Sequence, residues 1–411
     1  MDLFLRTYSL KLTESLNHRI KICVLKTCVF AFLAALSLCS CHSSAEKVKI
    51  AAKDSTIAVT EPPHLDPATY KRYHDMVSDF VDRNLSERNF SGGILVAKDG
   101  VVVYERYTGY SNRKNKTPVD SSTSLQVAST GKTLTSAAVL KLIQEGKMGL
   151  NDPVTKFFPN FPYTDVTVKM LLSHRSGLPN YLNYMEQMGW NRRIAATNQD
   201  VLNTLINWHP PQQYRPGTHF NYNNTNFVLL ALIIEKVSGI PYPQFMKDNF
   251  FTPLHMDHTF VKTQADSATV NYSYQANGAI WMPDLTDGPY GDKNIYSTPR
   301  DLLKWDQALY DGKLIHKDML DSAFTPLSNE KPGIKNYGLG WHLLMLPNHK
   351  KVIYHNGRWH GFNSAFARLT DEHVTIIMES NKINMGVYSI SKKMFNLFGE
   401  YDGHKDDSGE E

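Results

Sequence analysis

The sequence predicts an α+β fold: an antiparallel sheet flanked by helices, forming an α/β-sandwich, with an inserted and mainly helical lobe. Three observations carry this prediction. Strand-like runs with hairpin turns lie towards both ends of the chain, helical patterns fill the middle, and no internal repeat interrupts that order. A sheet needs a helical layer to bury its apolar face, so the simplest packing places strands from both chain ends in one sheet.

A helix and a hairpin open the folded part of the chain. The apolar spacing of residues 70–85 fits one face of a helix. Two runs rich in β-branched residues follow at 92–97 and 101–106, with Asp99-Gly100 between them. Asp-Gly between such runs is a strong hairpin signal, so we expect two antiparallel strands here.

The remaining elements follow from the same patterns. Helices are predicted at 132–146, 226–237, 299–309 and 384–398, and strands at 337–344, 351–354, 364–369 and 374–378. Ser297 and Thr298 are candidate caps for the helix that starts after them. Residues 371–373 separate the last two strands and predict a second hairpin.

Charge and cysteine content exclude several classes of function. The net charge is +4, but residues 1–41 hold five basic and two acidic side chains, so the rest of the chain is nearly neutral. A neutral body lacks the basic footprint of a nucleic-acid-binding protein. All four cysteines lie between Cys23 and Cys41, so the body has no disulfide, no cysteine nucleophile and no cysteine-ligated zinc.

The first 41 residues predict a lipoprotein-type signal peptide. An apolar run of about a dozen residues follows Lys26, too short to span a hydrocarbon layer of about 30 Å as a helix but suited to a signal-peptide core. It ends in Leu-Cys-Ser-Cys41, which resembles a bacterial lipobox and implies lipidation of Cys41. An ordinary cleaved signal peptide is the alternative. We therefore expect an exported, periplasmic protein that a lipid anchor holds to a bacterial membrane, specifically the outer membrane.

These signals divide the chain into four parts. Residues 1–41 form the signal peptide, and 42–67 form a polar tether that contains a Pro-Pro pair. Residues 68–398 form one folded domain. Residues 399–411 are short and acidic, and we expect them to be disordered.

One Ser-x-x-Lys pattern stands in a context that suits a nucleophile. Side chains three apart on a helix face each other, so Lys132 lies beside Ser129, and a neutral lysine can take the serine proton. The spacing alone is weak, because it recurs at Ser44, Ser111, Ser328 and Ser389. Ser129 differs in that it joins an extended stretch to an apolar helix with unpaired N–H groups at its start. The alternative is that Ser129 only caps that helix.

Two further patterns lie at junctions between elements. Tyr222-Asn-Asn224 follows a turn and precedes an apolar helix, so Tyr222 can project into a cleft; helix capping by Asn224 is the alternative. His355-Asn-Gly357 follows a predicted strand, and glycine there permits close approach of a substrate to the backbone. A surface loop with a chance histidine is the alternative.

Taken together and in this order, the three patterns resemble the motifs of the serine β-lactamase and penicillin-binding-protein superfamily. Surrounding segments are similar to its class C and DD-peptidase-like branch, notably LLSHRSGLPNY at 171–181 and GDKNIYSTPRDLLKWDQAL at 291–309. The resemblance covers about residues 70–398. It implies a β-lactamase/transpeptidase-like fold and a serine hydrolase domain.

The resemblance also implies three catalytic residues. Ser129 would attack a carbonyl carbon and form an acyl-enzyme. Lys132 and Tyr222 would share the transfer of its proton, and which of them is the base stays open.

Four residues would then bind the substrate. Asn224 would orient its amide, and His355 would bind or polarise its carboxylate. The backbone N–H groups of Ser129 and Arg358 would form an oxyanion hole next to Gly357.

The third motif bears on the substrate. His-x-Gly, in place of the Lys-Thr-Gly usual in β-lactamases, resembles DD-peptidases, D-amino-acid peptidases and related esterases. We expect a hydrolase that acts on an amide, a D-amino-acid peptide or an ester, with a cell-wall peptide or a β-lactam among the candidates. No cofactor and no metal are expected, because His255-Met-Asp-His258 lacks the further ligands that a metal needs. The alternatives are a slow-deacylating, penicillin-binding sensor and a peptidoglycan-binding scaffold.

Overall fold

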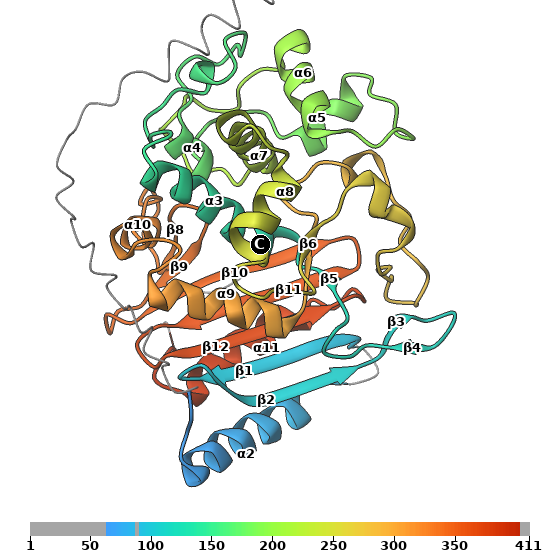
Figure 1. Cartoon of the computed structure of the whole chain (residues 1–411), viewed down its shortest axis with the longest axis vertical. Helices are drawn as coiled ribbons and strands as arrows, with labels where there is room; N and C mark the ends of the chain where they lie inside the picture. Colours follow the sequence, from blue (N-terminus) through green and yellow to red (C-terminus); the bar gives the residue numbers. More distant parts are fainter. Residues whose placement is uncertain (1–62, 87–89, 403–411) are drawn as a thin grey trace, which may run out of the picture. The chain divides into compact units, whose positions relative to one another are not determined.

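The computed structural model describes residues 63–86 and 90–402 (Figure 1). Residues 1–62, with the predicted signal peptide, Cys41 and most of the tether, lie outside the described residues, as do 87–89 and 403–411. Among the described helices, none is by itself long and apolar enough to cross a membrane; one pair, Asn224–Ser238 with Tyr242–Phe251, meets that criterion only jointly and is bent by 78°.

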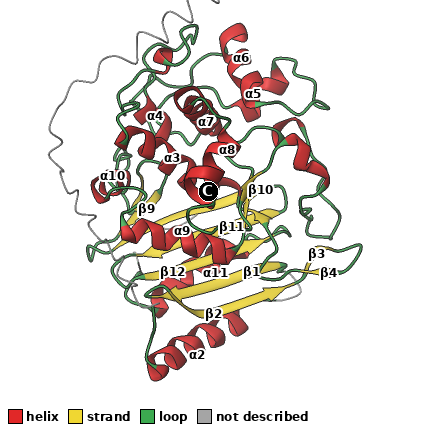
Figure 2. Ribbon diagram, viewed as in Figure 1, coloured by secondary structure: helices red, strands yellow, loops and turns green. Residues whose placement is uncertain are grey.

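A seven-stranded antiparallel sheet forms the centre of the described chain (Figure 2). Its strands, in spatial order, are β2 (Val101–Thr108), β1 (Gly92–Lys98), β12 (Val374–Ser380), β11 (Phe362–Leu369), β10 (Lys351–Trp359), β9 (His342–Met345) and β8 (Lys335–Tyr337). Because β1 pairs with β12, the sheet combines strands from both ends of the sequence, as predicted.

Two smaller sheets complete the strands. They consist of β3 (Tyr110–Asn112) with β4 (Thr117–Pro118), and of β5 (Leu125–Gln126), β7 (Ile295–Ser297) and β6 (Phe260–Val261) in that order. The second of these sheets holds the chain that leads to Ser129, because β5 ends at Gln126.

Helices cover both faces of the main sheet (Figure 1). Helices α2 (Pro67–Asn84) and α11 (Gly386–Met394) pack on one face. On the other face lie α9 (Pro299–Asp311), α3 (Lys132–Gln144) and the helical lobe. The remaining helices are α4 (Val168–Leu172), α5 (Tyr181–Gln187), α6 (Asn198–Trp208), α7 (Asn224–Ser238), α8 (Tyr242–Met246) and α10 (Lys317–Ala323). Helix α7 lies at the centre of the lobe and is buried over ten consecutive residues, 225–234.

Strand alternation explains why the sheet is buried on both faces. In β1, Leu95 packs with the helical lobe, whereas its neighbours Ile94 and Val96 pack with α2 and α11. Successive side chains of a strand point to opposite faces, so a central strand with apolar residues at every position contributes to two cores. The predicted α+β fold is thus confirmed. The alternating residues of β1 belong to the two hydrophobic cores on either side of the sheet.

The first hairpin follows its turn chemistry. Asp99 and Gly100 have φ values of +52° and +78°. Both are left-handed, as a two-residue type I′ turn requires, and Asp and Gly adopt this conformation more readily than other residues.

Several predicted boundaries are wrong. Residues 337–344 form two strands rather than one, because a turn at Gly340, with φ of +81°, separates β8 from β9. Strand β10 continues to Trp359, because it stays paired with β11 up to the pair Trp359–Phe362. The last helix ends at Met394 and continues as a 3-10 turn, Phe395–Leu397. Tyr401, in the segment predicted to be a disordered tail, is buried and hydrogen-bonded to Glu372.

Candidate active site

Ser129 lies in a 3-10 turn, η2 (Ala128–Gly131), that runs directly into α3. Ala128, immediately before it, has φ of +46°, a left-handed conformation that costs a non-glycine residue about 1–3 kcal/mol. Val127 is the N-cap of η2 and Gly131 that of α3, and neither cap involves a side chain. Ser129 is therefore not a helix cap, and the alternative explanation for this residue is excluded.

Lys132 is the buried centre of the site. Its side chain is fully shielded from solvent. Nζ lies 3.0 Å from Ser129 Oγ, 2.8 Å from Asn224 Oδ1 and 2.6 Å from the backbone oxygen of Asp292. An ammonium would donate to all three oxygens. A neutral amine would donate to the amide and carbonyl oxygens, which only accept, and would present its lone pair to the Ser129 hydroxyl.

The surroundings of Lys132 favour its neutral form. Burial lowers the pKa of Lys132 to about 7, because desolvation disfavours the charged amine. The carboxylate of Asp292 opposes this change in pKa, and the ammonium of Lys293 adds to it. A base whose pKa lies near the working pH is the most effective one.

Tyr222 and Asn224 come from the segment that enters α7. Asn223 caps this helix, since its Oδ1 accepts from the N–H of Thr225 at 2.9 Å. The Asn224 side chain therefore reaches Lys132 instead, and the capping alternative is excluded for Asn224. The ring of Tyr222 has its centroid 5.0 Å from Lys132 Nζ.

Both ring nitrogens of His355 are in contact with protein atoms. It is buried, and its Nδ1 lies 2.7 Å from the carbonyl oxygen of Asn356 while Nε2 lies 3.2 Å from Tyr337 Oη. The carbonyl can only accept, so Nδ1 carries the proton and Nε2 accepts from the tyrosine. Burial also holds the pKa of His355 well below its usual 6.5. The expectation that His355 binds or polarises a substrate carboxylate stays a prediction.

Gly357 and Arg358 bring β10 against the nucleophile. A Cβ at Gly357 would lie 2.2 Å from the carbonyl oxygen of Val127 and 3.0 Å from the backbone nitrogen of Ser129. Only glycine permits this approach. Arg358 follows in the same strand with an exposed side chain, and its Nη1 lies 4.0 Å from Met385 Sδ.

Four residues of the site carry no role in the sequence prediction: Tyr181, His174, Asp292 and Lys293. Lys293 donates to Tyr181 Oη and lies 3.2 Å from Asp292 Oδ2. His174 Nδ1 accepts from the N–H of Asn223 at 3.1 Å, and its ring centroid lies 4.3 Å from that of Tyr222. In the sequence these four residues lie in the family-like segments at 171–181 and 291–309, and Asp292-Lys293 is a charged pair directly after a glycine.

The other Ser-x-x-Lys serines have different surroundings. Ser111 Oγ donates to a backbone carbonyl six residues on at 3.3 Å, and Ser389 Oγ to one three residues back at 3.1 Å. Ser328 Oγ donates to an asparagine side chain at 3.1 Å. Ser44 lies outside the described residues. Of the four motif serines that the structure describes, Ser129 is the one with a hydrogen bond to the lysine of its own motif.

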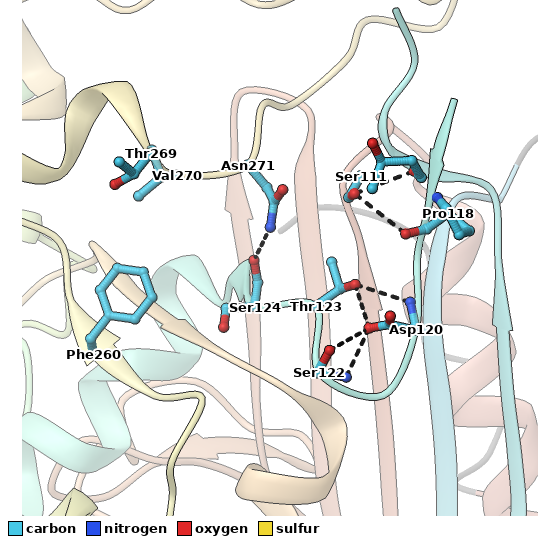
Figure 3. A pocket seen from close by; sticks show the side chains of 11 residues that line it. Ser111, Pro118, Asp120, Ser122, Thr123, Ser124, Phe260, Thr269, Val270 and Asn271 are labelled. Carbon is cyan, nitrogen blue, oxygen red and sulfur yellow. Dashed lines mark hydrogen bonds between the residues drawn. The ribbon is translucent and has the colours of Figure 1, made fainter. Parts of the chain in front are cut away.

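A separate polar cavity of about 340 Å³ lies near β5 (Figure 3). The lining residue nearest to Ser129 in the sequence is Ser124, five residues before it. The hydroxyls of Ser122 and Thr123 donate to Asp120 Oδ1, and Asn271 Nδ2 donates to the carbonyl of Ser124. These hydroxyls stabilise a turn, so we assign this cavity no part in the chemistry of Ser129.

One cluster beside the site has the composition of a metal site. Ligand atoms of Asp284, Asp287 and His360 lie within 4.8 Å of one another. The Asp287 carboxylate already accepts from Trp359 Nε1 at 2.7 Å and from His360 Nε2 at 3.0 Å. We therefore assign these residues a structural role, which is to fix Trp359 at the end of β10.

Comparison with known proteins shows the family and the fold of this chain. Residues 75–393 match the Beta-lactamase family. Penicillin-binding protein 4* of Bacillus subtilis (strain 168) is 33% identical over 312 residues, which are 72% of this chain and 69% of that protein. A penicillin binding protein from Bacillus halodurans has a TM-score of 0.68 at 22% identity, over 79% of this chain and 98% of the other. D-amino acid amidase from Ochrobactrum anthropi SV3 has a TM-score of 0.64 at 22% identity, over 80% and 98%.

The fold and the arrangement of Ser129, Lys132 and Tyr222 define the chain as one of the β-lactamase/transpeptidase-like proteins. Within that class, the chain belongs to the Beta-lactamase family, which includes hydrolases.

Proposed function

We propose that this protein is a serine hydrolase that forms an acyl-enzyme on Ser129 and acts on an amide, a D-amino-acid peptide or an ester. The observation that carries the proposal is the 3.0 Å contact between Ser129 Oγ and Lys132 Nζ, at a lysine that burial keeps partly neutral. A nucleophile and a base within hydrogen-bonding reach, with the base oriented by further partners, make the arrangement that covalent catalysis needs.

Acylation follows from these positions. Ser129 Oγ bonds to the substrate carbonyl carbon while its proton passes to Lys132 Nζ. The amide and carbonyl oxygens of Asn224 and Asp292 hold Nζ in place during this transfer. The bond to the leaving amine or alcohol then breaks, and the leaving group takes a proton, with Tyr222 beside Lys132 to share in this step.

Two N–H groups stabilise the negative charge that develops on the substrate oxygen. We assign them to the backbones of Ser129 and Arg358, because Gly357 brings β10 into contact with η2. A single donor of this kind is worth roughly 100- to 1,000-fold in rate in other enzymes. Water then cleaves the acyl-enzyme, and Ser129 regains its proton.

A neutral His355 orients the site rather than binding charge. It links β10 to Tyr337 of β8, and its own carbonyl accepts from Thr130 in η2 at 3.1 Å. The proposed substrate therefore needs no carboxylate at this position. Amides and esters with neutral groups there fit as well as peptides with a free carboxyl end.

The test is covalent labelling of residues 42–411 with a fluorophosphonate and with a slow β-lactam, read by peptide mass spectrometry. We expect the added mass on the peptide with Ser129, and none on Ser111, Ser328 or Ser389. Ser129→Ala should remain folded and unlabelled. Label on another serine, or full esterase activity in Ser129→Ala, would overturn the proposal.

Turnover separates the enzyme from the alternatives. Nitrocefin, short nitrophenyl esters and D-Ala-D-Ala peptides cover the candidate substrate classes. Steady turnover of one of them supports the hydrolase. A stoichiometric burst without turnover indicates a slow-deacylating sensor, and absence of both label and burst indicates a scaffold.

We also propose export and lipid anchoring through Cys41. The support is the lipobox-like sequence and the confinement of all cysteines to the first 41 residues. The tether would then hold the hydrolase domain in the periplasm, close to the surface of the outer membrane.

A further inference from the structure

We infer that Lys293 is a positioning residue of the catalytic site: its buried ammonium neutralises Asp292, so that Lys132 acts as a base without a facing negative charge. This inference rests on the proposed function, since it assigns Lys293 a part in the chemistry of Ser129 and Lys132. It also gives the Asp292-Lys293 pair a role other than the binding of substrate.

Lys293 is held in one place. Its side chain is 2% exposed. Its ammonium donates to Tyr181 Oη, lies 3.2 Å from Asp292 Oδ2, and sits 4.4 Å from the centre of the Trp359 ring. Tyr181 donates to the same Oδ2 at 3.0 Å, and Asp287 fixes the indole of Trp359. A buried cation that is surrounded in this way cannot move to solvent.

One residue connects this group to the catalytic lysine. The backbone oxygen of Asp292 accepts from Lys132 Nζ at 2.6 Å, while its carboxylate bonds to Lys293. Lys132 therefore lies close to one anion and one cation, both with almost no exposure. Charges interact more strongly where water is excluded. Without Lys293, the Asp292 carboxylate would attract a proton to Lys132 and oppose its action as a base.

Two histidines near Lys132, His174 and His355, do not supply this charge. The ring of Tyr222, from the segment before α7, lies beside Lys132 Nζ. The ring centroids of His174, after α4, and His355, in β10, lie 4.3 Å and 6.2 Å from that of Tyr222. Burial keeps the pKa of both histidines well below 6.5, so they are neutral at neutral pH. The charges acting on the pKa of Lys132 are those of Asp292, which raises it, and Lys293, which lowers it.

The experiment measures the rate of Ser129 acylation by a fluorophosphonate against pH in three variants. Lys293→Met removes the cation, so the acidic limb of the profile should move to higher pH by roughly one unit. Asp292→Asn removes the anion, so the limb should move to lower pH. Lys293→Arg keeps the charge, so the limb should stay where it is in the wild type. Thermal unfolding of each variant establishes that it is folded.

Opposite shifts for Lys293→Met and Asp292→Asn support the inference, because a purely structural loss would lower the rate without moving the limb. Unchanged limbs in folded variants would overturn it. If Lys293→Met does not fold, the inference is tested by Asp292→Asn alone: its acidic limb should move to lower pH. If the wild type is not labelled at Ser129, the proposed function itself is wrong. If the wild type is labelled but the acidic limb has the same pH in all variants, only the inference about Lys293 is wrong.

Discussion

Gly357 lies against Ser129 so closely that a single added carbon on Gly357 would come within 3.0 Å of the Ser129 backbone nitrogen. That nitrogen is one of the two proposed oxyanion donors, and Gly357 immediately precedes the other. The contact joins η2 to β10, two segments more than 220 residues apart in the sequence. The position of the nucleophile relative to the strand thus depends on the absence of a side chain.

We predict that Gly357→Ala lowers the rate of acylation by about 100-fold, because moving one oxyanion donor out of line costs about as much as removing it. The rate constant for fluorophosphonate labelling measures this loss. Gly149→Ala is the matched control, since a Cβ there meets atoms only at 3.7 Å or more. Equal rates in the two variants would show that the close contact has no catalytic importance.

Lys132→Arg should lose acylation by about 1,000-fold, because arginine does not release its proton at working pH and cannot serve as a base. Lys141→Arg, on the same helix and paired with Glu145 at the surface, is the control and should keep the wild-type rate. An arginine at 132 that supports most of the activity would remove Lys132 from the mechanism and leave Tyr222 as the base.

The wild-type rate of acylation should rise with pH through a midpoint of about 7. The reason is that burial lowers the pKa of Lys132 to about 7, and only the deprotonated amine accepts the serine proton. The sign follows directly: below the midpoint the lysine is charged and inactive, and above it the lysine is neutral and active. A rate that falls with pH through this range contradicts the assignment.

Glu379 should make the stability of the fold depend on pH. Its side chain is buried, neither carboxylate oxygen has a partner among the described residues, and burial raises its pKa well above 4.5. The folded state therefore keeps a proton that the unfolded chain releases above about pH 4.5, so this group costs stability as the pH rises.

Glu379→Gln should remove that cost, and its melting temperature relative to the wild type should increase between pH 5 and pH 8. The exposed Glu186→Gln is the control and should show a constant difference. A difference for Glu379→Gln that does not change with pH would show that this carboxyl is ionised in the folded protein.

Cys41→Ala should release the protein from the membrane fraction of a bacterial host with lipoprotein processing. Membrane and soluble fractions, probed with an antibody against the hydrolase domain, measure the distribution. Ser40→Ala keeps a small residue before the cysteine and should remain anchored. Persistence of Cys41→Ala in the membrane fraction would rule out lipidation at this residue.

The sequence was most informative where function demands particular side chains. Ser129, Lys132, Tyr222 and Asn224 were recognisable from their motifs, and the side chains of Ser129 and Asn224 both lie within 3.0 Å of Lys132 Nζ. The hairpin at Asp99-Gly100 was equally clear, since few residues adopt its backbone angles without strain.

The sequence was least informative where distant segments decide the local structure. His355-Asn-Gly357 has the composition of a turn, but pairing with β11 holds it as a strand. The same pairing buries His355, whose charge state follows from its environment and not from its type. The local sequence around Lys293 does not reveal its role, because its partners Tyr181 and Trp359 are remote in sequence and only the fold brings them together.

The pairing of β1 with β12 also sets the order in which the molecule can be made. About 275 residues separate Lys98 from its partner Val374, which corresponds to roughly 15 to 55 seconds of synthesis at 5–20 residues per second. During that time the first hairpin has an unpaired edge, and unpaired edges are where chains associate wrongly. Until the last strands emerge, the edge of β1 that later pairs with β12 is therefore open to pairing with another chain.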